Sequence, residues 1–275
     1  MYRRRTTLPP QKKADVISKV AYSREENKQS VLLSNTELKL NVSNNPRKIH
    51  CSVCICIVMN TDDELDIVSN NLSCLQSLFE KSFIVFVIDS ESSLIEWSTR
   101  HENSLTIQTT FTEEHAKRNL YLKFVHDNKL SFNYMMVIDP LISLKTPLKP
   151  ESFDFFRKDT EFNAMFANQS YKYYDIESLV DDKKQVYKID DMEVKQKKIK
   201  QYQVHIPKNT GLLPVNSAFG GLAVYKTSVL DTNNKYTTDN HISFNLNISK
   251  AYSKMFIDSS FIIETNPNNS FLYEK

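Results

Sequence analysis

From residue 49 onward the chain alternates continuous apolar runs with segments of helical periodicity. The apolar runs at 49–59, 83–88 and 134–138 are typical of strands that are covered on both faces of a sheet. Between the first two runs, apolar side chains recur alternately three and four residues apart, which predicts a helix. The residues of this stripe are Leu65, Val68, Leu72, Leu75 and Phe79.

A second helix and three further strands continue the alternation. The segment 112–128 has apolar positions at helical spacing, and short strands are expected at 105–109, 163–168 and 218–225. Strands that alternate with helices predict an α/β fold, here one domain with a mostly parallel central sheet flanked by helices. In such sheets ligands bind at the carboxyl ends of the strands.

Polar residues follow four of the predicted strands and are candidates for ligand contacts: Asn60, Asp89, Asp139 and Asn168. Asp139 would hold a ribose or a metal ion, or it would cap the turn that Asp-Pro sequences commonly start. Asp89, with Glu91 nearby, would bind a nucleotide or supply a base, although paired acidic residues after a strand also form ordinary turns.

Composition divides the chain into two parts, the second of which contains an unusual segment. Residues 1–46 are polar and weakly periodic and predict an N-terminal extension, and residues 47–275 predict the α/β domain. Within this domain, residues 181–209 form a Lys-rich segment that interrupts the order of strands and helices. We expect either an amphipathic helix or lid over the site, or a solvated charged surface.

The overall charge and hydropathy exclude several classes of protein. A formal net charge of +2, from 35 basic and 33 acidic residues, argues against nucleic-acid binding as the main function. Apolar runs fall short of the roughly 18 residues of a membrane helix, and no secretory signal is recognisable. A soluble, cytoplasmic protein is therefore expected. The four cysteines are interpreted as small buried hydrophobic residues rather than as metal ligands or disulfides: Cys51, Cys54, Cys56 and Cys74.

All three glycines lie within eleven residues: Gly211, Gly220 and Gly221. Glycine is required where the backbone adopts a positive φ or where other atoms approach the main chain closely. The pair Gly220–Gly221 therefore predicts a close approach. A ligand and a neighbouring strand of the protein are the two candidates for what approaches.

Three more polar side chains are candidates, each with a structural alternative. Arg118 would reach a phosphate, or it would pair with Glu114 one helical turn away. Asp175, which follows a cluster of tyrosines, would accept hydroxyls of a sugar, or it would cap a helix. His241 would bind a metal ion or a phosphate, or it would be an ordinary histidine at a strand edge or on the surface.

The order of several motifs resembles that of glycosyltransferases of the GT-A type, over residues 48–273. YYDIESL, starting at Tyr173, is similar to the family's YYD element, which follows a strand ending in Asn, here Asn168. The Arg118–Asn119 pair resembles a pair on a family helix. SAFGGLAVYK, starting at Ser217, resembles a Gly-Gly strand, and HISFNLNI, starting at His241, resembles an element that contains Glu-His.

The resemblance implies transfer of a hexose from a nucleotide-diphosphate sugar to a hydroxyl of a glycan or protein acceptor. It implies Asp175 as the catalytic base and Mn²⁺ or Mg²⁺ held by Asp139 and His241. It further implies contacts to the donor nucleotide from Asn60, Asp89, Arg118 and Asp139, and contacts to the sugar or acceptor from Asn168, Ser217, Gly220 and Gly221.

Three positions depart from the family pattern. Leu141 stands where the second aspartate of the Asp-x-Asp metal motif is expected, Val180 where an arginine is expected, and Asn240 where the glutamate before His241 is expected. These departures support an alternative, a catalytically inactive module that binds a nucleotide or sugar, or a partner subunit of an active transferase. In a third interpretation the protein is a structural one that binds no ligand, with residues 181–209 as its contact surface.

Overall fold

The computed structural model describes residues 32–33, 48–60, 65–158, 160–183 and 185–265. The predicted extension 1–46 lies outside the described residues except for Leu32–Leu33. These two residues form strand β1, which pairs antiparallel with β4 of the domain.

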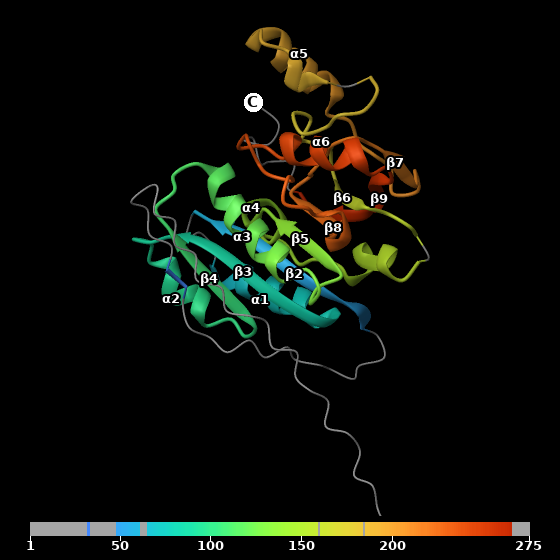
Figure 1. Ribbon diagram of the computed structural model, residues 1–275. Coiled ribbons are helices and arrows are strands. Elements are labelled where there is room, and N and C mark those ends of the chain that lie inside the picture. The colour runs from blue at the N-terminus through green and yellow to red at the C-terminus, as the bar shows by residue number, and fades with distance from the viewer. Residues whose placement is uncertain (1–31, 34–47, 61–64, 159, 184, 266–275) are drawn as a thin grey trace, which may run out of the picture.

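The described strands form a single nine-stranded sheet in the order β1-β4-β3-β2-β5-β8-β6-β9-β7 (Figure 1). In chain order the remaining strands are β2 (Ile49–Met59), β3 (Phe79–Asp89), β4 (Ser104–Thr109), β5 (Tyr134–Ile138), β6 (Ala164–Gln169), β7 (Leu212–Pro214), β8 (Leu222–Lys226) and β9 (Met255–Ile263). The strands β2, β3, β4, β5, β6 and β9 run in the same direction, and β1, β7 and β8 run opposite to them. The predicted α/β class with a mostly parallel sheet is therefore confirmed.

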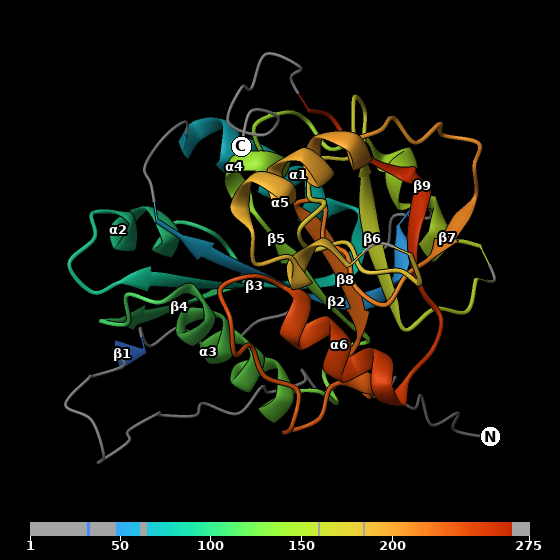
Figure 2. The same cartoon turned by 90° about the horizontal axis from the view of Figure 1, so that it is seen from above.

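Helices cover both faces of the sheet (Figure 2). The α-helices are α1 (Leu65–Ser77), α2 (Leu94–Thr99), α3 (Glu114–Asp127), α4 (Pro140–Ser143), α5 (Met192–Tyr202) and α6 (Ile242–Ala251), and the 3₁₀ helices are η1 (Pro150–Phe156), η2 (Val186–Lys188) and η3 (Thr227–Val229). On one face, α3 and α6 contribute Tyr121 and Phe244 to a core that contains Cys54 and Cys56 of β2. Alternate residues of the same strand point to the other core, because side chains along a strand alternate between the two faces.

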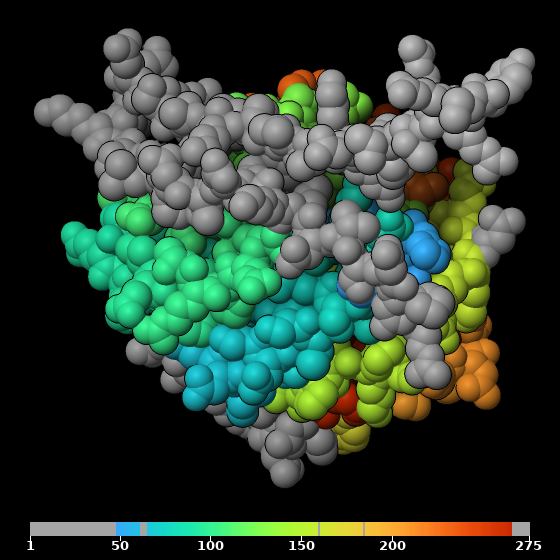
Figure 3. Space-filling model, turned by 90° about the horizontal axis from the view of Figure 1, so that it is seen from below, coloured from blue at the N-terminus to red at the C-terminus, as the bar shows by residue number. Residues whose placement is uncertain are grey.

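The second core is covered by α1, α2 and η1. Leu72 of α1, Trp97 of α2 and Phe153 of η1 belong to this core together with Ile55 of β2. The indole N–H of Trp97 donates a 2.9 Å hydrogen bond to Ser69 Oγ, which joins α2 to α1. Figure 3 shows this side in space-filling form, with the cyan surface of α1 beside the green surface of the segment that contains α2.

Several boundaries differ from the sequence prediction. Phe79 was expected to end the helical stripe, but it is the first residue of β3. The strand expected at 218–225 begins at Leu222, because Gly220 and Gly221 have φ angles of +67° and +85° and cannot continue a strand.

Cys54 and Cys56 are buried as predicted. The prediction is wrong for Cys74, which lies on the exposed side of α1.

The Lys-rich segment 181–209 contains η2 and α5, so an amphipathic helix is present there. Ile199 is buried against the core, Lys195 pairs with Glu177 at 2.6 Å, and the carbonyl of Val204 accepts a hydrogen bond from the N–H of Tyr173. Helix α5 stands at one end of the molecule (Figure 1). Among the helices of the described ranges, none is both long and apolar enough to cross a membrane.

Candidate functional site

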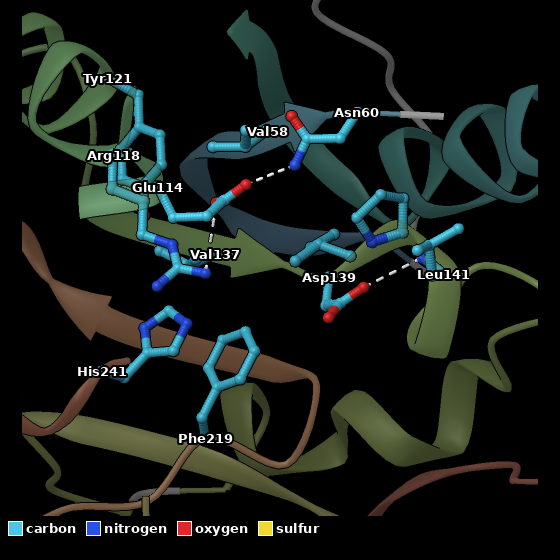
Figure 4. A pocket seen from close by; sticks show the side chains of 12 residues that line it. Val58, Asn60, Glu114, Arg118, Tyr121, Val137, Asp139, Leu141, Phe219 and His241 are labelled. Atoms are coloured by element: carbon cyan, nitrogen blue, oxygen red, sulfur yellow. Dashed lines mark hydrogen bonds and ion pairs between the residues drawn. The ribbon is translucent and has the colours of Figure 1, made fainter. Parts of the chain in front are cut away.

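A cavity of about 130 Å³ opens where β2 and β5 end, between α3 and the start of α6 (Figure 4). The predicted ligand contacts Asn60, Arg118, Asp139 and His241 lie together around it. The remaining lining residues are Val58, Glu114, Tyr121, Val137, Ile138, Pro140, Leu141 and Phe219. Of the polar residues expected at the carboxyl ends of strands, Asn60 and Asp139 share this cavity, whereas Arg118 comes from α3 and His241 from the start of α6.

Asp139 lies at the end of β5 and takes part in both local structure and the cavity. Its Oδ1 accepts a 3.0 Å hydrogen bond from the N–H of Leu141 and so caps α4, and its own N–H donates to the carbonyl of Gly221 at 2.9 Å. Burial raises the pKa of this carboxyl group to about 6, although the Leu141 N–H and the charge of Arg118 act in the opposite direction. Both interpretations of Asp139, the cap and the ligand contact, fit this geometry.

Arg118 brings a guanidinium group from α3 to the opposite side of the cavity. Its side chain is 17% exposed, and its nearest carboxylate contact is Glu114 Oε2 at 3.5 Å. The guanidinium also donates a hydrogen bond to the carbonyl of Asp239 and lies over the Tyr236 ring at 5.7 Å. Arg118 thus lies near Glu114, as one interpretation predicted, and also lines the cavity, and its contact with a phosphate stays a prediction.

A buried lysine connects Asp89 to this cavity. Lys117 Nζ lies 2.9 Å from Asp89 Oδ1 and donates a 2.9 Å hydrogen bond to Asn60 Oδ1, and the amide of Asn60 donates in turn to Glu114. Sequence reasoning missed Lys117, because a lysine on an amphipathic helix is usually solvated and no local pattern marks this one as buried.

His241 is the N-cap residue of α6 and is buried beside Arg118. Its ring stacks on Phe219 with a 3.6 Å separation of the ring centres, and its Nδ1 lies 3.3 Å from the hydroxyl of Tyr236. Burial, followed by the charge of Arg118, lowers the pKa of His241 well below its ordinary value. The imidazole is therefore neutral at pH 7, and the alternative of a histidine at a strand edge or on the surface is wrong.

The two adjacent glycines are approached closely by the protein itself. A Cβ at Gly220 would lie 2.3 Å from the carbonyl oxygen of Ala167 in β6, and one at Gly221 would lie 2.8 Å from Ile142 Cγ2 of α4. The close approach predicted from the sequence is confirmed, and protein atoms account for it. Direct contact of Gly220 and Gly221 with a sugar or acceptor stays a prediction.

Asp175 supports this glycine turn from outside the set of cavity-lining residues. Its Oδ1 accepts a hydrogen bond from the N–H of Ser178, and its Oδ2 accepts one from the N–H of Gly220, both at 3.3 Å. Burial raises the pKa of the Asp175 carboxyl group. Asp175 therefore helps to place the turn that presents Phe219 to His241, and its role as a base stays a prediction.

Asn168 and Ser217 are completely buried. The amide of Asn168 donates to the carbonyls of Ile206 and Ser259, at 2.9 and 3.1 Å, and Ser217 Oγ accepts a 3.1 Å hydrogen bond from Asn245. Internal hydrogen bonds thus use both side chains, and the predicted contacts of either with a sugar or acceptor stay predictions.

The donor set at the cavity does not fit a resident Mn²⁺ or Mg²⁺ ion. Hard divalent cations take several oxygen ligands, and within the described ranges no group of three or more His, Cys, Asp or Glu side chains could hold a metal. Leu141 places a hydrocarbon side chain where a second carboxylate was expected. The positive charge of Arg118 acts on both proposed ligands, Asp139 and His241, and would repel a second cation.

A scan against models of protein families finds no match, and neither does a search of curated protein sequences. Among solved structures, the fold is similar to that of the mannosyltransferase PcManGT from Pyrobaculum calidifontis, which was solved in complex with GDP-Man and Mn²⁺. The likeness has a TM-score of 0.49 at 11% sequence identity. It covers 84% of this chain and 61% of that one.

Proposed function

We propose that this protein binds a nucleotide-diphosphate sugar at the cavity and transfers the hexose to a hydroxyl of a glycan or protein acceptor. The proposal rests on one observation: hydrogen-bond donors and a carboxylate acceptor lie on opposite sides of one cavity (Figure 4). Arg118 offers N–H donors on one side, and Asp139 offers a carboxylate on the other. A nucleotide sugar presents phosphate oxygens and hydroxyl donors within a short distance, which suits this arrangement.

The proposed contacts follow from where each side chain lies. Arg118 binds the diphosphate, and Asp139 accepts a hydrogen bond from a ribose or sugar hydroxyl. Asn60 and Asp89 flank the nucleoside, because they lie at the ends of the neighbouring strands β2 and β3. The cavity of about 130 Å³ is smaller than the roughly 300 Å³ of typical ligand sites. It therefore encloses one part of the donor, and the rest lies outside it.

In the transfer step, the acceptor hydroxyl oxygen bonds to the anomeric carbon as the bond from that carbon to the phosphate oxygen breaks. The electron pair of the broken bond leaves with the nucleoside diphosphate, and the hydroxyl proton passes to a carboxylate base. We propose Asp175 as this base, because it is the aspartate of the YYD-like element and its Oδ2 accepts a hydrogen bond from Gly220, next to Phe219 at the cavity. Arg118 stabilises the charge that develops on the leaving diphosphate.

A second candidate function is a module that binds a nucleotide sugar without turning it over. It is favoured by two apolar side chains at positions where the transferase resemblance expects charged ones. Leu141 lines the cavity, and Val180 is buried, with its backbone bridged to Ser217 and Gln185. These positions therefore contribute packing and no charge.

Binding followed by product analysis tests both candidates. Thermal unfolding is measured with UDP-, GDP- and CMP-sugars, each with and without Mn²⁺, and any stabilising donor is then incubated with hydroxyl acceptors and analysed by mass spectrometry. A ligand at a hundred times its dissociation constant adds about 2.7 kcal/mol to the free energy of unfolding. A stabilising donor that is also consumed supports the transferase. Stabilisation without release of the nucleoside diphosphate supports the binding module, and the absence of stabilisation by any donor contradicts both.

A further inference from the structure

We infer that the guanidinium of Arg118 is the counter-charge for the ligand's diphosphate, so that the cavity binds nucleoside diphosphates without a divalent cation. The inference rests on the proposed function and specifies the chemistry of its donor site. Because the donor set at the cavity does not fit a resident metal ion, another group there must neutralise the charge of the phosphates.

Among the described residues that line the cavity, Arg118 is the one lysine or arginine. A guanidinium carries five N–H donors in a planar fork, which suits two phosphate oxygens at once. One donor is used by the carbonyl of Asp239. The contact with Glu114, at 3.5 Å, is longer than the 2.7–2.9 Å or so of a charge-assisted hydrogen bond. The fork is thus held at one end and remains available to a stronger acceptor in the cavity.

The hydrogen bond to the carbonyl of Asp239 holds this guanidinium, which lies at the end of a continuous series of polar contacts. The series runs from Asp89 through Lys117 and Asn60 to Glu114, and from Glu114 to Arg118. Asn60, itself bound by Lys117, donates to Glu114 Oε1, whereas Glu114 Oε2 is the oxygen that faces Arg118. A donor group that is fixed before the ligand arrives loses little entropy on binding.

The other groups at the cavity leave room for this role. His241 is neutral and stacks on Phe219, so it neither competes for an anion nor repels Arg118. The two carboxylates at the cavity are Glu114 and Asp139. Glu114 is engaged by Asn60, and Asp139 lies across the cavity from Arg118 (Figure 4). The proposed role of Asp139 is therefore to accept hydrogen bonds from hydroxyls of the ligand.

The experiment measures binding of GDP and UDP to the full chain by calorimetry, in EDTA and in Mn²⁺. Guanosine and uridine serve as phosphate-free probes. The variants are Arg118→Gln and Arg118→Lys, with Arg157→Gln as the control, since Arg157 pairs with Asp154 outside the cavity. Circular dichroism checks that each variant is folded.

We expect one of the diphosphates to bind equally tightly in EDTA and in Mn²⁺. Arg118→Gln should weaken it by at least about tenfold, since hydrogen bonds to charged groups are the strong ones. Arg118→Lys should bind with intermediate affinity, because it keeps the charge but loses the fork. Binding of the matching nucleoside and the affinity of Arg157→Gln should not change.

Other results overturn the inference in distinguishable ways. Diphosphate binding that requires Mn²⁺ overturns it and leaves the proposed function standing. Wild-type affinity in a folded Arg118→Gln variant also overturns it, because another group must then neutralise the phosphates. If neither diphosphate binds in either buffer, the inference and the proposed donor site both fail. The comparison of EDTA with Mn²⁺ uses the wild-type chain and is decisive even if the variants do not fold.

Discussion

Replacing Asp139 by asparagine should stabilise the protein at pH 8 more than at pH 4. The side chain is half-buried at the cavity, and burial raises its pKa from 3.8 to about 6. The folded protein therefore favours the protonated form. The stability associated with that form is fully present below pH 3.8 and is lost as the pH rises through about 6. Asparagine is neutral at every pH and can still accept the hydrogen bond from Leu141.

The size of the expected stability difference follows from the pKa shift of Asp139. Each pKa unit corresponds to about 1.4 kcal/mol, so a shift of this size amounts to about 3 kcal/mol when the carboxyl group is fully ionised. The Asp139 carboxyl group is partly exposed to solvent in the cavity, and solvent screening reduces the cost of ionising it. In the unfolded chain this group is still partly ionised at pH 4, which lowers the difference between the two pH values further. We therefore expect the free energy of unfolding of Asp139→Asn, relative to wild type, to be about 2 kcal/mol more favourable at pH 8 than at pH 4.

Urea denaturation at both pH values measures this difference, with fluorescence of the single tryptophan, Trp97, as the probe. Trp97 is buried beside α1 and should report loss of the core. Asp182→Asn, at an exposed position, is the matched control. Subtracting the free energy of unfolding of the wild type from that of the variant at each pH removes the contribution of His241. The pKa of His241 is lowered by folding, so its contribution has the opposite pH dependence and is lost as the pH falls below 6.5. A stability difference that is the same at pH 4 and pH 8 would refute the reasoning.

Two further substitutions test the glycine turn and its support. Gly220→Ala should lower the free energy of unfolding by about 3 kcal/mol, because the new Cβ would be strained at a positive φ and would clash with Ala167. Gly211→Ala should lower it by about 1 kcal/mol, because Gly211 also has a positive φ but nothing lies within 4 Å of its Cβ position. Equal losses in urea denaturation would show that crowding is not what requires glycine at 220. If Asp175 is the base, Asp175→Asn should lower kcat for sugar transfer by at least about a hundredfold, with KM little changed. An unchanged kcat alongside reduced stability would leave Asp175 a purely structural role.

The course of the main strands and helices could be predicted because the signals are local. Ile49–Met59 and Tyr134–Ile138 are strands with the predicted boundaries, and the stripe from Leu65 predicted α1. The same local logic failed at Phe79, whose helical spacing continues the stripe although it starts β3. An apolar residue at the junction of two elements satisfies both patterns, and packing decides between them.

The glycine pair shows where sequence reasoning stops. Scarcity of glycine indicated that the backbone at Gly220–Gly221 needed unusual freedom, and both φ angles are positive. The identity of the neighbour was open, since a ligand and a strand make the same demand on the residue. Only the fold shows that Ala167 of β6 and Ile142 of α4 fill the space.

The sequence by itself determined the α/β class and the placement of Asn60, Asp89 and Asp139 at the carboxyl ends of strands, because hydrophobic periodicity is a property of neighbouring residues. The tertiary structure alone decided that Arg118 and His241 face Asp139 across one cavity and that Lys117 is buried between Asp89 and Asn60. The sequence alone specifies which side chains can carry a charge. Its pKa, its partners and its access to a ligand depend on distances between segments that are far apart in the chain, and folding alone sets those distances.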